Sequence, residues 1–234
     1  MKIAVDGYEV LTPMGGVGRI TSSLVSVLAA LDPGAEIALF LRRPSGLVFP
    51  PSVKEQVLTP DKGYLRWQNL PLRGALRGLR PDILLAPNYT LPVCYGGPAV
   101  LFEHDISFVS HPEWYSRRDV LKTRWLVPHS LKRAAAVITE SEFSRKEILA
   151  HFPFVREDKI RVIYPGLDDR FLPSDPEAVA VWKGQKGLQG RRIIGFLGSI
   201  FNRRHIPELI AAVRLLRQAE EDVCLYLVGR DRTS

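Results

Sequence analysis

Short apolar segments of strand length alternate along the chain with longer segments whose apolar residues recur at helical spacing. Between residues 17 and 31, for example, Val17, Ile20, Leu24, Leu28 and Leu31 fall on one face of a helix. Strands that alternate with helices predict an α/β fold in which a parallel sheet carries helices on both faces. The expected strands cover residues 2–6, 36–41, 82–86, 98–102, 136–139, 159–164, 192–197 and 223–228.

Two of the expected helices contain a proline. Helices are predicted at residues 17–31, 65–79, 117–134, 142–150 and 204–218. Proline lacks the N–H that a helix interior needs, so Pro71 should break the second helix and Pro128 should kink the third.

The composition of the sequence changes between residues 167 and 190, where Asp, Pro, Ser and Gly accumulate and the hydrophobic periodicity weakens. We therefore expect a first domain over residues 1–168, a linker over 169–190 and a second unit over 191–234. That second unit reads as one strand–helix–strand, which is too small to cover both faces of a sheet. Either it docks on the first domain or the natural protein continues beyond residue 234.

The net charge of +7 favours anionic partners such as nucleotides, acidic lipids or lipid-linked phosphates. Nucleic acid is not expected, because zinc-finger spacing, RNP-like aromatic strands and long basic tails are missing from the sequence. The segment 65–80 mixes arginines with apolar residues. It is consistent with peripheral contact with an anionic membrane, or with an ordinary amphipathic helix whose arginines face solvent.

Targeting signals and cysteines constrain the environment. No run approaches the ~18 apolar residues that span a bilayer, and Asp6 and Glu9 follow the first strand too closely for a signal peptide. We therefore expect a cytoplasmic protein, peripheral to the membrane at most. The two distant cysteines, Cys94 and Cys224, are predicted to be small buried thiols rather than a disulfide or a metal pair.

Three segments that follow expected strands carry candidate site residues, since ligands of parallel sheets bind beyond the carboxyl ends of the strands. The first is Gly15-Gly16-Val17-Gly18-Arg19, where glycines open the backbone at a helix N-terminus that can bind an anion. It is neither a GxGxxG dinucleotide motif nor a P-loop. The alternative is a glycine-rich turn without a ligand.

The second candidate segment is Glu103-His104-Asp105 and the third is the run from Gly198 to His205. In the second, a carboxylate can orient a histidine that exchanges protons near neutral pH; the alternative is a surface loop with a structural histidine. In the third, Arg203 and Arg204 lie at a helix start, where their charge opposes the helix dipole unless a diphosphate binds. The alternative there is solvated surface arginines.

Five segments in order resemble the family-four retaining glycosyltransferases. They are the glycine loop at 15–19, the HDISF and HPEW residues at 104–114, AVITESEFS at 136–144, KIRVIYPGLD at 159–168 with Phe171, and residues 198–210. The corresponding family patterns are HDLSF…PEW, VITVSEFS, KIxVIYNGVDxxF and GTLxPRKNxxxLI. The resemblance runs over essentially the whole chain.

The resemblance implies a GT-B fold, in which an N-terminal Rossmann-like domain binds the acceptor and a second Rossmann-like domain, here represented by its first βαβ, binds the sugar nucleotide. It implies a hexosyltransferase that retains the anomeric configuration and uses no metal or cofactor beyond the NDP-sugar donor. The acceptor would be a polysaccharide, a lipopolysaccharide or a glycolipid. By position, Gly15, Gly16 and Arg19 would approach the donor diphosphate, with His104 and Asp105 beside the transferring sugar.

The second unit departs from the family in ways that bear on donor binding. Gly198, Ser199, Arg203 and Arg204 would hold the donor, with Arg204 in the place of a phosphate-binding lysine and Ser199 where some members carry an arginine. The family's two glutamates separated by seven residues do not occur. The open alternative is therefore a truncated, non-catalytic binding or docking module. A dehydrogenase is a third hypothesis, disfavoured because the first strand lacks GxGxxG.

Overall fold

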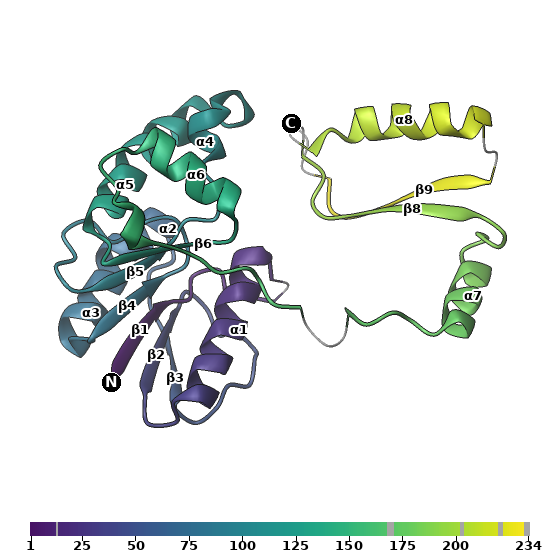
Figure 1. The fold of residues 1–234 in the computed structure, drawn as a ribbon. Helices are drawn as coiled ribbons and strands as arrows, with labels where there is room; N and C mark the ends of the chain where they lie inside the picture. Colours follow the sequence, from purple (N-terminus) through teal and green to yellow (C-terminus); the bar gives the residue numbers. More distant parts are fainter. Residues whose placement is uncertain (13, 168–170, 202–203, 220–221, 232–234) are drawn as a thin grey trace. The chain divides into compact units, whose positions relative to one another are not determined.

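The structure, a computed structural model, describes residues 1–12, 14–167, 171–201, 204–219 and 222–231 (Figure 1). The chain divides into two compact units, Met1–Gly166 and Leu167–Ser234. The strands are β1 Lys2–Asp6, β2 Glu36–Leu41, β3 Val53–Val57, β4 Ile83–Ala86, β5 Ala99–Phe102, β6 Ala136–Thr139, β7 Ile160–Val162, β8 Arg192–Leu197 and β9 Val223–Val228. The α-helices are α1 Gly16–Leu31, α2 Tyr64–Trp67, α3 Arg73–Leu79, α4 Ser107–Ser110, α5 Arg117–Arg133, α6 Glu142–His151, α7 Pro176–Gln185 and α8 Ile206–Ala219.

The first unit is a seven-stranded parallel sheet in the order β3-β2-β1-β4-β5-β6-β7. This order confirms the predicted Rossmann-like α/β fold. Because the order reverses between β1 and β4, the loops that follow these two strands diverge and leave a crevice at the carboxyl edge of the sheet. The candidate residues of the first unit all belong to that edge.

Both faces of this sheet are covered. Side chains alternate along a strand, so Ile3 and Val5 of β1 point to one face and Ala4 to the other. Ile3 and Val5 lie in one core cluster with residues of α1, such as Val25. Ala4 lies in the other cluster, to which α2, α3, α5 and α6 contribute. The sheet is therefore the middle layer of three, as the sequence predicted.

The two prolines are accommodated without ending a helix. A π-helical turn, Gln68–Leu72, contains Pro71 and joins α2 to α3 in one continuous helical run, so the predicted break is wrong. A π-turn shifts the hydrogen-bond pattern by one residue, which is how a helix can absorb a proline that donates no hydrogen bond. Pro128 lies inside α5, which continues to Arg133.

The basic segment 65–80 is anchored in the first unit by its apolar residues. Trp67, Leu72 and Leu76 are buried in the core, and the indole Nε1 of Trp67 donates to the carbonyl of Leu58 at 3.0 Å. Arg66, Arg77 and Arg80 are exposed. This is the arrangement of an amphipathic helix that covers a sheet. No helix among the described residues is long and apolar enough to cross a membrane.

Some elements differ from the expectations. β3 was not predicted, because it is an edge strand of mostly exposed, polar residues without an apolar alternation. α7 lies inside the segment expected to be a linker, and its N-terminus is capped by the Asp175 carboxylate. α8 begins at Ile206, two residues after the expected start. Cys94 is exposed and Cys224 half-buried, so the prediction of two buried thiols is wrong; both are free.

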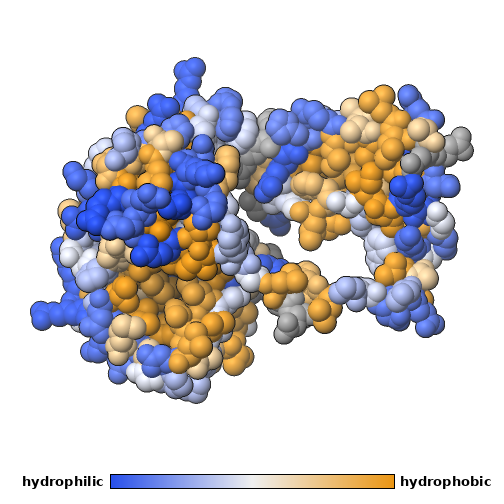
Figure 2. All heavy atoms as spheres, viewed as in Figure 1, coloured by the Kyte–Doolittle hydropathy of each residue, from blue (hydrophilic) through white to orange (hydrophobic). Residues whose placement is uncertain are grey.

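The second unit contains α7, α8 and a two-stranded parallel sheet of β8 and β9. β8, α8 and β9 form the predicted single βαβ. Ile206 and Val213 of α8 and Val223 of β9 are buried, whereas most other residues of both strands are half-buried or exposed. Figure 2 shows hydrophobic residues at the surface over this unit.

Candidate functional site

The side chain of His104 is held by hydrogen bonds at the carboxyl edge of the sheet. It follows β5, and its side chain is 9% exposed. Its Nδ1 lies 2.6 Å from Oε1 of Glu140, the residue that follows β6, and its Nε2 lies 2.8 Å from the carbonyl oxygen of Pro87, the residue that follows β4. Three neighbouring strand ends therefore fix one imidazole ring.

Both ring nitrogens of His104 face groups that accept hydrogen bonds, the Glu140 carboxylate at Nδ1 and the Pro87 carbonyl at Nε2. The ring of Tyr89 contacts the imidazole edge-on, with 5.1 Å between the ring centroids. This arrangement suits a histidine that donates a proton or a hydrogen bond.

Asp105 has a local structural contact. Its Oδ1 accepts hydrogen bonds from the backbone N–H of Ser107, at 2.9 Å, and from the hydroxyl of Ser107. These bonds form an Asx-type turn at the start of α4. The predicted catalytic role of Asp105 stays a prediction, and its carboxylate shapes the loop that carries His104.

Glu103 is fully buried, and neither carboxylate oxygen has a hydrogen-bond partner among the described residues. Burial raises the pKa of the Glu103 carboxyl well above its ordinary value, and the nearby charge of Asp105 raises it further. An unpaired buried charge is costly, so burial favours the protonated form of this carboxyl.

A second polar cluster lies beneath the crevice, around Asp6 at the end of β1. Its carboxylate accepts hydrogen bonds from the N–H of Tyr8 at 3.2 Å, from the hydroxyl of Tyr64 at 3.0 Å and from the Gln68 amide at 3.4 Å. The Gln68 amide also donates to the carbonyl of Thr90 at 2.7 Å. Burial raises the pKa of Asp6 to about 6, and these hydrogen bonds offset part of that rise. This cluster joins β1, the segment 64–72 and the loop after β4.

The glycine loop leaves the N-terminus of α1 open. Gly15 is the N-cap of α1, no side chain caps the helix, and no acidic residue lies in its first turn. A Cβ atom at Gly15 or Gly16 would meet nothing within 4 Å, whereas one at Gly18 would lie 2.2 Å from the carbonyl oxygen of Glu9. Gly18 is therefore needed for packing, whereas the open space at Gly15 and Gly16 leaves the N-terminus of α1 accessible to an anion.

The glycine loop and His104 share one edge of the sheet. β4 alone separates β1 from β5, so the ends of these strands lie roughly 10 Å apart, which is two interstrand spacings. Arg19 is exposed in the first turn of α1.

The candidate residues of the second unit precede α8. Gly198 adopts a φ of +148°, and its N–H donates to the carbonyl of Val228 at 2.9 Å. A Cβ at Gly229 would lie 1.7 Å from the carbonyl oxygen of Gly198, so the two backbones are in close contact. Ser199 is half-buried and Arg204 is exposed, just before the helix start. Arg203 lies outside the described residues.

Sequence reasoning missed several partners in these clusters. Glu140, Tyr89, Tyr64 and Gln68 come from loops and helices distant in sequence from the residues they contact. One signal was available: Glu140 stands where the family pattern VITVSEFS has a valine. An acidic residue at the end of an apolar strand is unusual enough to mark a site.

Comparison with solved structures places this fold in a class. The glycosyltransferase WaaG, involved in lipopolysaccharide biosynthesis, superposes with a TM-score of 0.73 at 16% identity over 98% of this chain and 64% of WaaG. Anabaena HepE, solved in complex with UDP and glucose, gives a TM-score of 0.63 at 19% identity over 98% of this chain and 61% of HepE. The fold is that of the GT-B glycosyltransferases.

The sequence comparison then identifies the family. Residues 14–171 match Glycosyltransferase Family 4, and the chain belongs to this family. A curated relative, O-antigen chain mannosyltransferase B of Escherichia coli, is 27% identical over 92% of this chain and 60% of the relative. The chain thus spans about 60% of the length of that relative. These findings confirm the resemblance derived from the motifs.

Proposed function

We propose that the protein transfers a hexose from an NDP-sugar to a polysaccharide, lipopolysaccharide or glycolipid acceptor, with retention of the anomeric configuration. The observation that carries this proposal is the position of His104, fixed between Glu140 and Pro87 on the same edge as the open N-terminus of α1. Family membership supports glycosyl transfer, and the relative named above is a mannosyltransferase.

In this proposal the donor diphosphate binds at the glycine loop. The first backbone N–H groups of α1 and the positive end of its dipole stabilise a bound phosphate. The further donor contacts expected from the sequence, Arg19 in the first unit and Gly198, Ser199, Arg203 and Arg204 in the second, stay a prediction. HepE has been solved with UDP-glucose, and a starch synthase of the same fold with ADP, which supports a nucleotide ligand.

His104 acts on the transferring sugar. A sugar hydroxyl can replace the Pro87 carbonyl as the acceptor for the Nε2 proton, while Glu140 keeps the ring oriented and stabilises its charge. Departure of the nucleoside diphosphate places negative charge on the leaving group, and fixed cations and helix N-termini stabilise that charge without a metal. Exclusion of water from the closed site limits hydrolysis of the donor.

The proposal is tested with the purified 234-residue chain and a panel of donors: GDP-mannose, UDP-glucose and dTDP-rhamnose. We expect one donor to bind, and transfer to a lipopolysaccharide-derived acceptor to fall by about 10²–10⁴-fold in His104→Ala. Glu140→Gln should lower kcat with little change in KM, since it orients the histidine. NMR of the product's anomeric proton reports retention.

His111→Ala is the matched control, because His111 is an exposed histidine that stacks on Trp114 at 4.2 Å and contacts Glu113. Equal losses in the His104 and His111 variants would contradict the proposal. The alternative of a non-catalytic docking module predicts that none of the three donors binds, even at millimolar concentration.

A further inference from the structure

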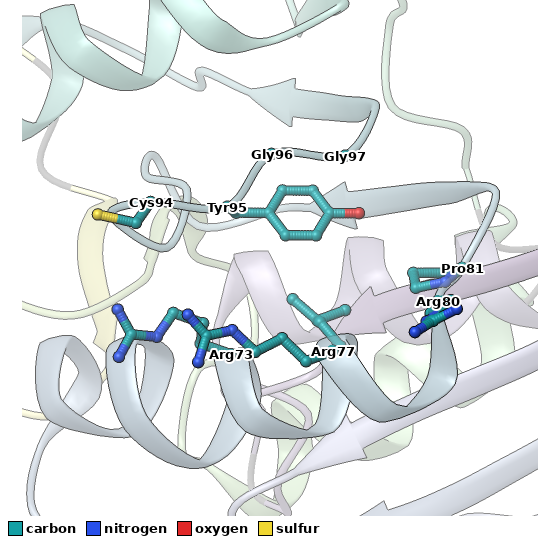
Figure 3. Close-up of a pocket in the computed structure, with 9 residues that line it drawn as sticks. Arg73, Arg77, Arg80, Pro81, Cys94, Tyr95, Gly96 and Gly97 are labelled. Carbon is teal, nitrogen blue, oxygen red and sulfur yellow. The ribbon is translucent and has the colours of Figure 1, made fainter.

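A basic pocket lies at the opposite, amino-terminal edge of the same sheet (Figure 3). It has a volume of about 340 Å³ and lies between α3 and the loop that joins β4 to β5. Arg80 and Pro81 precede β4, and Gly96 and Gly97 precede β5, whereas His104 follows β5. The four residues of β5 separate the two edges by roughly 13 Å at ~3.3 Å per residue. The pocket is therefore distinct from the candidate active site.

Three arginines line this pocket without an acidic counterpart. Arg73, Arg77 and Arg80 all come from α3 and its C-cap, and no carboxylate lines the pocket or forms an ion pair with them in the described part of the chain. The nearest acid in sequence, Asp82, instead accepts a hydrogen bond from the backbone N–H of Lys2 at 2.7 Å. Three like charges around one concavity repel each other, and a bound anion with two or more charges relieves that repulsion.

The loop opposite the arginines is held in a strained shape. Cys94 in this loop has a φ of +68°, which side chains other than glycine rarely adopt. The Arg133 side chain fixes the loop by donating a hydrogen bond to the carbonyl of Tyr95. Such strain persists only where the surroundings impose it, and it gathers at ligand sites. Figure 3 shows the arginines of α3 facing this loop.

The chemistry of the lining indicates the ligand. The backbone N–H groups of Gly96 and Gly97 have no hydrogen-bond partner among the described residues, and both residues line the pocket together with the three arginines. Guanidinium groups bind phosphate oxygens through paired hydrogen bonds. The volume falls at the lower end of small-molecule pockets, about 300–1,000 Å³, which suffices for a phosphate and the group attached to it.

We infer that this pocket is a second anion site, which binds a phosphate monoester or diphosphate group independently of the sugar-nucleotide donor. The group can belong to a soluble phosphorylated compound or to the headgroup of an anionic lipid. In the second case the basic segment 65–80 holds the protein at a membrane through one defined headgroup contact. The inference stands on the pocket alone and does not depend on glycosyl transfer.

The test measures binding of inorganic diphosphate to the 234-residue chain by calorimetry, in a buffer without phosphate. We expect saturable binding that is about tenfold weaker in Arg77→Gln, because a charge-assisted hydrogen-bond partner is lost. Arg66→Gln is the matched control: it removes the same charge from the same helical run, is exposed and does not line the pocket. Equal weakening in both variants would show diffuse surface attraction and overturn the inference, as would absence of binding.

A chemical probe locates the ligand. Cys94 lines the pocket and is an exposed free thiol, whereas Cys224 belongs to the other unit. We expect diphosphate to slow alkylation of Cys94 by iodoacetamide and to leave Cys224 unchanged, as followed by peptide mass spectrometry. Unchanged alkylation of Cys94 at saturating diphosphate would overturn the assignment to this pocket.

Vesicles distinguish the two sources of the phosphate group. The protein is sedimented with vesicles of equimolar phosphatidylglycerol and phosphatidylcholine. A lipid headgroup is identified if the protein co-sediments, if diphosphate releases it from the vesicles, and if Arg77→Gln but not Arg66→Gln weakens the binding. Diphosphate binding in solution without co-sedimentation identifies a soluble phosphorylated ligand.

Discussion

β1 in the first unit and β8 in the second are both short, apolar, parallel strands, yet they are buried to very different degrees. All residues of β1 except the first are buried, whereas no residue of β8 is, and Leu197 at its end is 80% exposed. β1 is an interior strand, the third of seven, with helices on both faces of the sheet. β8 has one neighbouring strand among the described residues.

This difference shows that the burial of a strand by neighbouring strands and helices, rather than its composition, decides how much the strand contributes to stability. An apolar side chain stabilises the fold only in proportion to the area that is removed from water. The buried polar side chains follow the same division: those of the described residues, Asp6 and Glu103 among them, all belong to the first unit. Core packing can therefore be compared between the two units, whereas the buried polar side chains can be tested only in the first.

The largest expected effect comes from comparing a buried leucine of the first unit with an exposed leucine of the second. Leu84 in β4 is fully buried and Leu215 in α8 is 66% exposed. Leu84→Ala should lower the free energy of unfolding by about 2–5 kcal/mol, since it removes buried contacts and leaves a cavity. Leu215→Ala should change it by less than about 0.5 kcal/mol. Urea unfolding with hydrogen exchange, read for each unit, measures both. Similar effects would contradict the contrast.

The next largest expected effect on stability comes from substituting one glycine in each unit by alanine. Gly18→Ala places a Cβ 2.2 Å from the carbonyl oxygen of Glu9, a backbone atom that cannot rotate away, so we expect a loss of up to about 3 kcal/mol. A Cβ at Gly195 in β8 meets nothing within 4 Å. Gly195→Ala should be neutral or stabilise by up to about 1 kcal/mol, because it restricts the unfolded chain. Thermal unfolding of the two variants measures both effects. A Gly18→Ala protein as stable as the unsubstituted protein would contradict the prediction and show that α1 can shift to make room for the Cβ.

The smallest effect depends on pH and belongs to Asp6. Its folded pKa, about 6, exceeds the ordinary 3.8. A raised carboxyl pKa stabilises the fold when the group is protonated, and this stability is lost as the pH rises from about 3.8 through about 6. Between pH 4.5 and 7.5 the loss is about 2 kcal/mol. Asp6→Asn should remove that share of the pH dependence of urea unfolding. An unchanged pH dependence in this variant would mean that Asp6 is ionised at little cost.

Most of the fold followed from periodicity. The predicted strands of the first unit are all present within one or two residues, because burial imposes an apolar pattern on a central strand. β3 escaped prediction because it is an exposed edge strand, and α7 because its residues are exposed and its periodicity is weak. The continuous helix through Pro71 could not be foreseen, since a π-turn is a local choice that packing of Trp67 and Leu72 enforces.

The candidate site, too, could be predicted from the sequence only in part. His104 and the glycines at 15–16 were found from the sequence, because polar and glycine residues directly after apolar strands fall at one edge of a parallel sheet. Which groups contact His104 could not be read, because Pro87 and Glu140 lie 17 and 36 residues away along the chain. The basic pocket could not be predicted for the same reason, although the arginines of the segment 65–80 stand out in the sequence.

The sequence by itself determined the α/β class, the order of most strands and helices, the family and the residues that follow each strand. These properties depend on local periodicity and on short motifs, which are written directly in the chain. Only the tertiary structure decided which strand ends are neighbours, that Glu140 rather than Glu103 or Asp105 contacts the His104 ring, and that three arginines surround one pocket. Contacts, burial and the resulting pKa values depend on distances between residues remote in sequence, and folding alone sets those distances.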